Sequence, residues 1–192
     1  MSNFWRYKEI TKGCDNMDWD EFFIELCKTV SKKSKDKSTK IGCVIVGPDN
    51  EVRSIGYNGF PRGVIDKTSE DKIQIDDLII PQQTISENNK KILSRFERPL
   101  KYKWTEHAER NAIYNAARAG IKLKNCTIYI YGLPPCTDCS RAIIQSGIKT
   151  IIYQCSNKEI PERWSEDISI SKEMLNEACI TIKEINNEER TL

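Results

Sequence analysis

The chain has a single histidine, His107, which lies two residues before Glu109. Farther along the chain, two residues separate Cys136 from Cys139, and Pro135 precedes Cys136. One imidazole and two thiolates suit Zn²⁺, and a zinc ion held by three protein ligands keeps a fourth position open for water. A structural zinc site usually requires a fourth Cys or His, and the sequence has no second histidine to supply one. The residue types and spacing therefore predict a catalytic zinc site, with Glu109 close to the bound water.

These residues occur in the order H-x-E and then P-C-x-x-C, which is the signature of zinc enzymes that deaminate nucleobases. A C-x-x-C pair alone also fits a redox pair or a structural zinc knuckle, and an isolated H-x-E carries almost no information. The combination, with each motif at a predicted strand-to-helix junction, favours a metal site. The other cysteines have no partner at ligand spacing, and we assign most of them to packing: Cys14, Cys27, Cys43, Cys126, Cys155 and Cys179.

A zinc site with an adjacent carboxylate predicts hydrolysis. Zinc lowers the pKa of a bound water toward about 7, which makes a nucleophile available at neutral pH. We expect this nucleophile to attack an amidine-like carbon that bears an amino group. Glu109 would take the proton of the water, pass it to the ring nitrogen and later protonate the departing ammonia. Removal of this carboxylate should therefore abolish turnover and leave zinc bound.

Apolar periodicity predicts the elements at the start of the chain. Apolar residues recur at three- and four-residue steps between Trp19 and Val30, which predicts a helix. Two runs rich in β-branched residues, at 41–46 and 51–57, flank a Gly-Pro-Asp-Asn turn, which predicts a β-hairpin. A loop rich in Gly, Pro and Asn follows the second run.

Predicted helices and strands alternate after residue 105. The expected elements are a helix that ends near Gly120, a strand at 125–131, a helix at about 137–145, a strand at 148–153, a helix at 165–177 and a strand at 179–185. This order predicts an α/β fold whose central sheet has helices on both faces. The two motifs then begin successive helices, and parallel βα units would bring both helix N-termini to one edge of the sheet. The positive dipole of a helix N-terminus favours ionised thiols there.

The composition fits one globular domain, and we expect residues 1–192 to form it. Hydrophobic residues make up 39% of the chain and charged residues 30%. The net charge of +2 gives no broad electrostatic footprint for nucleic acid, so we do not expect nucleic acid as a partner. No apolar stretch approaches the length of a membrane span, and we expect no membrane partner. The first 20 residues are charged and lack the apolar region of a signal peptide. Several of the eight cysteines fall in apolar runs, where a free thiol packs as a small apolar group. We therefore predict reduced thiols and a cytoplasmic location.

A polar segment at about 64–98 interrupts the pattern before His107. This segment contains neither Cys nor His, so it is not expected to hold a second zinc ion. We interpret it as an insertion within the domain, with a short helix near 86–96. A lid, an oligomer contact and a surface loop without a function remain alternatives for it.

Four segments of the chain resemble the deoxycytidylate (dCMP) deaminase family within the zinc-dependent cytidine deaminase superfamily. They are S-T-K-I-G-C-V-I-V at 38–46, G-Y-N-G-F-P-R-G at 56–63, H-A-E-R-N-A-I at 107–113, and P-C-T-D-C followed by A-I-I-Q-S-G-I within 135–148. The resemblance covers roughly residues 18–185 apart from the insertion. It implies a three-layer α/β/α cytidine-deaminase-like fold with a central mixed sheet of about five strands. It also implies hydrolysis of dCMP to dUMP plus ammonia, which supplies dUMP for thymidylate synthesis.

By position, the resemblance makes His107, Cys136 and Cys139 the ligands of one catalytic Zn²⁺ and Glu109 the proton shuttle. It assigns Asn58, in the loop that faces the sugar and base, to the substrate.

The implied substrate is a small-molecule nucleotide. Its phosphate carries about −1.5 to −2 charges near neutral pH, and Lys35, Lys40 and Arg62 are our candidates to pair with it. Ala108 is a further candidate contact to the substrate. The resemblance also implies a homo-oligomer, often a hexamer, and in some members activation by dCTP and inhibition by dTTP. The long insertion is unusual for the family, so the number of subunits and the effector response stay open.

Several related functions remain as alternatives. Deaminases of free nucleosides normally have C-A-E in place of H-A-E. Deaminases of tRNA adenosine share both metal motifs but generally lack the G-Y-N-G-x-P-x-G loop, and binding to RNA favours a more basic protein. Deamination of dCTP, of modified dCMP or of a base in single-stranded DNA requires only changes around the same zinc site. A zinc-stabilised pseudoenzyme that binds nucleotides is a non-enzymatic alternative, and Glu109 argues against it because a structural site has no need of that carboxylate.

Overall fold

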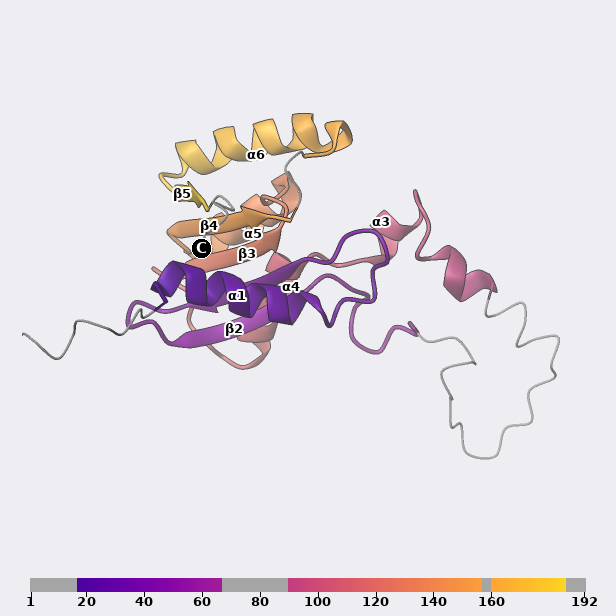
Figure 1. The fold of residues 1–192 in the computed structure, drawn as a ribbon, viewed down its shortest axis with the longest axis horizontal. Helices are drawn as coiled ribbons and strands as arrows, with labels where there is room; N and C mark the ends of the chain where they lie inside the picture. The colour runs from indigo at the N-terminus through magenta and orange to yellow at the C-terminus, as the bar shows by residue number, and fades with distance from the viewer. Residues whose placement is uncertain (1–16, 67–89, 157–159, 186–192) are drawn as a thin grey trace, which may run out of the picture.

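The computed structural model describes residues 17–66, 90–156 and 160–185, and these residues build a five-stranded mixed sheet in the order β2-β1-β3-β4-β5 (Figure 1). The strands are β1 (Gly42–Val46), β2 (Val52–Tyr57), β3 (Thr127–Gly132), β4 (Thr150–Cys155) and β5 (Thr181–Glu184). Strand β1 pairs antiparallel with both β2 and β3, whereas β3, β4 and β5 are parallel. The predicted mixed sheet of about five strands and the predicted hairpin are therefore confirmed.

Helices cover both faces of the sheet, as predicted for a three-layer fold. Helix α1 (Trp19–Ser31) packs on one face, where its Phe23 and Cys27 join Val44 of β1 in one buried cluster. Helices α4 (Ala108–Arg118), α5 (Thr137–Ser146) and α6 (Ser165–Glu177) contribute to a second cluster, which also contains Cys43 and Ile45. Successive residues of β1 thus face opposite layers, which explains why all five residues of this interior strand are buried.

Capping residues and a turn residue explain where some of the predicted helices and strands begin and end. Asp18 caps α1 because its side chain accepts a hydrogen bond from the backbone N–H of Asp20 at 3.2 Å. Gly147 ends α5 in the left-handed conformation, with φ of 77°, which favours glycine at this position. Asn50 adopts a positive φ of 63° in the turn between β1 and β2.

The part of the predicted insertion that the structure describes runs back toward the sheet. Residues 90–94 are helical, in agreement with the short helix predicted near 86–96, and residues 67–89 lie outside the described residues. The chain then forms the short helix α3 (Lys101–Trp104), and the 3₁₀ turn η2 (Glu162–Trp164) precedes α6. Apolar periodicity predicted neither α3 nor η2. Among the described residues, no helix has the length and apolar character that crossing a bilayer requires.

Candidate active site

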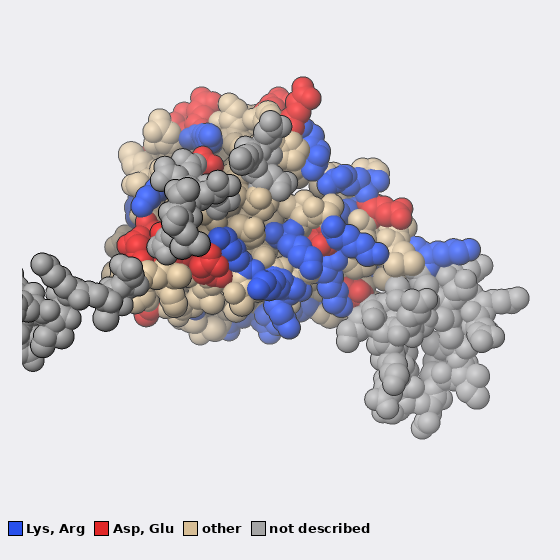
Figure 2. Space-filling model, viewed as in Figure 1, with Lys and Arg blue, Asp and Glu red and all other residues tan. Residues whose placement is uncertain are grey.

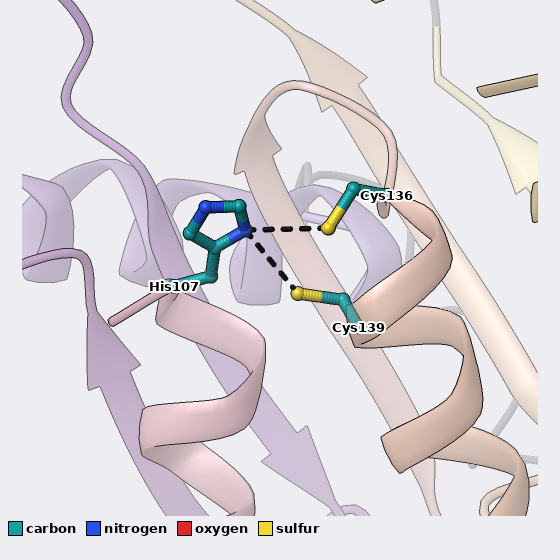
Figure 3. Close-up of side chains that lie close together, drawn as sticks. All are labelled: His107, Cys136 and Cys139. Atoms are coloured by element: carbon teal, nitrogen blue, oxygen red, sulfur yellow. Dashed lines mark hydrogen bonds between the residues drawn. The ribbon is translucent and has the colours of Figure 1, made fainter. Parts of the chain in front are cut away.

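The starts of α4 and α5 bring His107, Cys136 and Cys139 together (Figure 3). His107 is the N-cap residue of α4, Cys136 is the N-cap residue of α5, and Cys139 lies in the first turn of α5. The Nδ1 atom of His107 lies 3.3 Å from the Sγ atom of Cys136 and 3.5 Å from the Sγ atom of Cys139. The three ligand atoms lie within 4.8 Å of one another. One nitrogen and two sulfur donors at this separation fit a single tetrahedral Zn²⁺ with its fourth position open.

The protonation states of these three side chains depend on one another. The hydrogen bonds of Cys136 with Cys139 and with His107 outweigh burial and lower the pKa of Cys136 to about 4. The bond with Cys136, together with burial, raises the pKa of Cys139 well above its usual value. Burial lowers the pKa of His107, but the hydrogen bond with Cys136 and the charge of Glu109 outweigh it and raise this pKa to about 8. Because a metal ion requires thiolates and a neutral imidazole, metal binding at this site releases protons.

Glu109 lies in the first turn of α4 and is only 2% exposed. Its Oε2 atom has no hydrogen-bond partner among the described residues. Burial raises the pKa of this carboxyl group above its usual range. A buried carboxylate oxygen without a partner is unfavourable for folding, and such groups are characteristic of functional sites. The carboxyl group is therefore available to exchange a proton with a ligand beside the metal ligands.

Close backbone contact with β2 sets the position of α4. A Cβ atom on Gly56 would lie 2.2 Å from the carbonyl oxygen of Ala108 and 2.4 Å from the backbone nitrogen of Ala112, so only glycine permits this approach. Ser54 also donates a hydrogen bond from its hydroxyl to the carbonyl of Ala112 at 2.7 Å. Ala108, a predicted substrate contact, is fully buried in this helix–sheet interface and is not part of the pocket lining.

Two asparagine side chains of α4 fasten the helix to the edge strand β2. The amide nitrogen of Asn111 donates to the carbonyl of Tyr57, and that of Asn115 donates to the carbonyl of Ile55, each at 2.8 Å. The two asparagines are four residues apart, so they project from the same face of the helix. They satisfy carbonyl groups that an edge strand would otherwise leave without protein partners.

The loop that carries the cysteines is held by α6. The carboxylate of Asp167 accepts hydrogen bonds from the backbone N–H of Thr137 at 3.0 Å and from its hydroxyl at 2.8 Å. The hydroxyl of Ser171 donates to the carbonyl of Pro135 at 2.8 Å and lies 2.6 Å from the hydroxyl of Ser140. Sequence patterns did not identify Asp167 or Ser171, because nothing in the local sequence distinguishes them from other polar residues of a helix.

A backbone bridge and two ion pairs fix the segment before His107. Gly59 and Glu106 exchange backbone hydrogen bonds of 3.0 and 2.8 Å, which join the loop after β2 to the start of α4. The Glu106 carboxylate accepts from the backbone N–H of His107 at 3.0 Å and pairs with Arg110 at 2.6 Å. Arg110 also lies 3.5 Å from the carboxylate of Asp138 in α5, so it connects the two helix starts.

Asn58, a predicted substrate contact, lines the pocket beside the metal ligands but is only 4% exposed. Its Oδ1 atom accepts from the backbone N–H of Ile41 at 2.9 Å. Its Nδ2 atom donates to the carbonyl of Thr39 at 2.9 Å and to the carboxylate of Asp36 at 3.3 Å. The side chain therefore joins the loop before β1 to the loop after β2 and forms part of the pocket wall.

A pocket extends from the metal ligands toward solvent and encloses about 660 Å³, including space open to solvent. His107, Glu109 and Cys136 contribute to its lining. Its other lining residues include three cations and two aromatic residues from α3, η2 and the segment before α3: Arg98, Lys101, Tyr102, Arg163 and Trp164.

The three cations proposed from the sequence do not line this pocket. Lys35 forms an ion pair with Asp66 at 3.0 Å, and Arg62 donates to the side-chain oxygen of Asn115 at 2.6 Å. Lys40 is exposed. Figure 2 shows Lys and Arg side chains gathered over the end of α1 and the loop after it, which is the lysine-rich stretch that also carries Lys35 and Lys40. The cations of the pocket instead come from segments without a periodic pattern.

Comparison with known proteins agrees with this geometry. The family model described as "Cytidine and deoxycytidylate deaminase zinc-binding region" matches residues 17–155. A deoxycytidylate deaminase of Mus musculus is 34% identical over 142 residues, which are 74% of this chain and 67% of that protein. A protein of Aliivibrio fischeri described as "Uncharacterized deaminase in luxG 3'region" is 32% identical over 164 residues, with coverage of 85% and 91%.

The fold also matches a solved structure. The dCMP deaminase of the cyanophage S-TIM5, in complex with dCMP and dUMP, superposes with a TM-score of 0.57. The match covers 88% of this chain and 100% of the other, at 19% sequence identity. It therefore supports the fold and carries no information about the substrate of this chain.

Proposed function

The chain belongs to the cytidine and deoxycytidylate deaminase zinc-binding family, and from this premise we propose that it hydrolyses dCMP to dUMP and ammonia. Its His-Cys-Cys group fits the one zinc ion that the family binds. The observation that carries the proposal is the buried carboxyl group of Glu109, whose Oε2 atom has no partner among the described residues and which lines the same pocket as two of the ligands. A structural zinc site has no use for such a group.

Metal binding and proton transfer fall to different residues of the chain. When bound, zinc supplies a water molecule that ionises near neutral pH. His107, Cys136 and Cys139 would hold the metal, and Glu109 would accept a proton from this water at its carboxylate. Glu109 would then transfer this proton to the ring nitrogen of cytosine, take the second proton of the water from the hydroxyl group formed at C4, and deliver it to the amino group as the C4–N bond breaks, so that dCMP and water give dUMP and ammonia. The raised pKa of the Glu109 carboxyl group suits a group that must both accept and donate protons.

The choice of dCMP has two supports. A relative at 34% identity, from Mus musculus, is a deoxycytidylate deaminase. The pocket also carries the cations that a nucleotide phosphate requires, whereas a free nucleoside has no group to match them.

We also propose that the protein forms a homo-oligomer; the family resemblance favours a hexamer and names dCTP and dTTP as the effectors to test. Exposed apolar side chains on the edge strand β2 and on α4 support association: Val52, Ile55, Tyr57 and Tyr114. Light scattering tests the oligomeric state, and a monodisperse monomer would contradict it. Ammonia release from dCMP with and without dCTP or dTTP tests the effector response, and an unchanged rate would contradict that response. A cytoplasmic location remains a prediction from cysteine usage.

Ammonia release tests the proposed reaction. Zinc-loaded protein is assayed with dCMP, CMP, deoxycytidine, dCTP and a single-stranded DNA oligonucleotide. We expect the highest kcat/KM with dCMP. Higher activity on another substrate would support zinc-dependent deamination but show that dCMP is not the preferred substrate. Binding of dCMP without ammonia release from any substrate would favour a pseudoenzyme.

A further inference from the structure

The three cations of the pocket differ in how much of their hydrogen-bonding capacity is already used. The Nζ atom of Lys101 lies 2.5 Å from the carboxylate of Asp36 and 2.7 Å from the hydroxyl of Ser38. The Lys101 side chain is only 11% exposed, and that of Asp36 is 7% exposed. Lys101 and Asp36 therefore neutralise each other within the pocket wall, and Lys101 has little charge left for a ligand.

The two arginines are nearly free. Within residues 17–66, 90–156 and 160–185, Arg98 makes one long contact, in which Nη2 donates to the hydroxyl of Ser38 at 3.4 Å. Arg163 has no hydrogen bond or ion pair among the residues of the chain that the structure describes. Both side chains are exposed where they line the pocket, in contrast to the buried Glu109. Each guanidinium group carries five N–H donors, so the open part of the pocket offers two cations with most of their donors unused.

An aromatic contact brings the two arginine-bearing segments together. Tyr102 of α3 and Trp164 of η2 are far apart in the sequence, but their ring centroids lie 5.9 Å apart with the ring planes perpendicular. Both rings line the pocket. Arg163 immediately precedes Trp164, and Arg98 lies in the turn before α3, so this contact places both arginines on the same pocket.

We propose that Arg98 and Arg163 bind the 5′-phosphate of the substrate and thereby select a nucleotide over a nucleoside. This inference rests on the proposed deamination, because it places the cytosine ring at the buried end with Glu109 and the phosphate at the exposed end. A phosphate monoester carries about −1.5 to −2 charges at neutral pH, which two guanidinium groups match. Arginine is also suited to the phosphate group because two parallel N–H donors can bind two of its oxygens.

Substitution of each arginine by glutamine tests the proposal, because glutamine keeps a polar side chain and removes the charge. The kcat/KM values of zinc-loaded Arg98→Gln and Arg163→Gln are measured with dCMP and with deoxycytidine. Each variant should lose roughly tenfold to hundredfold in kcat/KM for dCMP, mainly through KM, since a hydrogen bond to a charged group is removed. The value for deoxycytidine should stay close to that of the unsubstituted protein. Arg118→Gln, an exposed arginine of α4 outside this pocket, is the control and should change neither value.

A binding measurement separates this proposal from the proposed reaction. Calorimetry compares the affinities for dUMP and deoxyuridine in the unsubstituted protein and in the double variant Arg98→Gln/Arg163→Gln. We expect a preference for dUMP that disappears in the double variant. Equal affinities for dUMP and deoxyuridine in the unsubstituted protein would overturn the assignment. So would a preference for dUMP that persists in the double variant and disappears in Arg62→Gln. The protein could also prefer dUMP over deoxyuridine, lose this preference in the double variant, and yet release no ammonia from any substrate. This result would support the phosphate site and reject the proposed deamination.

Discussion

The carboxylate of Asp167 binds both the backbone N–H and the hydroxyl of Thr137, the residue directly after the metal ligand Cys136. A side chain from α6 thus fixes the first turn of α5, from which Cys136 and Cys139 project. Residues that orient metal ligands without touching the metal typically change metal affinity tenfold to a hundredfold when they are replaced.

We therefore expect Asp167→Ala to weaken zinc binding by about tenfold or more. Competition with a chromophoric chelator measures the zinc affinity directly. Glu173→Ala is the control, because it removes an exposed carboxylate from the same helix. If both variants bound zinc as tightly as the unsubstituted protein, Asp167 would not have this positioning role.

Gly56 is predicted to be essential for the close packing of α4 against β2. A methyl group at this position would meet the backbone of Ala108 and Ala112 at 2.2 and 2.4 Å, and these atoms cannot rotate away. Overpacking of this kind typically destabilises a protein by about 1–3 kcal/mol, so Gly56→Ala should lower the free energy of unfolding by at least that amount. Urea denaturation measures the change. Gly59→Ala is a matched control, since its Cβ would lie 3.7 Å from the ring of Tyr57, an ordinary contact; equal stability of the two variants would contradict the prediction.

The ion pair of Asp36 with Lys101 predicts a dependence of stability on pH. Burial alone would raise the pKa of Asp36, but hydrogen bonds from Lys101 and from the backbone of Ser38 and Thr39 outweigh it and lower this pKa. The stabilisation is therefore complete above the unfolded pKa of about 3.9 and disappears as the pH falls through the lower folded pKa.

The variant Asp36→Asn isolates this contribution. At neutral pH it leaves the buried ammonium group of Lys101 without its charge partner, so the free energy of unfolding should fall. The difference between the two proteins should begin to shrink as the pH falls below about 4, and it should be smallest below the lower folded pKa, where Asp36 is protonated in both states of the unsubstituted protein. Urea denaturation of the metal-free proteins across this range measures the difference. A difference that stayed constant with pH would show that the Asp36 charge does not stabilise the fold.

The elements that build the sheet and the metal group could be predicted from the sequence because their signals are local. Periodic apolar residues predicted α1, and the alternation of helices and strands after residue 105 predicted α4, β3, α5 and β4 at close to their observed positions. His107, Cys136 and Cys139 could be named because they match the H-x-E and P-C-x-x-C signature, and the expectation that helix starts in successive βα units meet at one edge of a sheet supported their grouping. The structure brings these three side chains together as expected.

The cations that face the pocket could not be predicted in the same way. Lys35 and Lys40 belong to a lysine-rich loop and are exposed, and Arg62 is bound to Asn115. Arg98 and Arg163 reach the pocket only because α3 and η2 dock against each other, and neither element has a periodic apolar pattern. The G-Y-N-G segment likewise identified Asn58 but could not indicate that its amide is used to join two loops.

The central claim is that Glu109 moves protons while His107, Cys136 and Cys139 hold the metal. The most direct test is to measure zinc content and ammonia release from dCMP in Glu109→Gln, with Cys139→Ser as the comparison. We expect Glu109→Gln to retain about one zinc ion per chain and to lose turnover by about a hundredfold or more, since general acid–base catalysis contributes factors of this size. Cys139→Ser should lose both zinc and turnover. A Glu109→Gln protein with full zinc content and turnover equal to that of the unsubstituted protein would contradict the account.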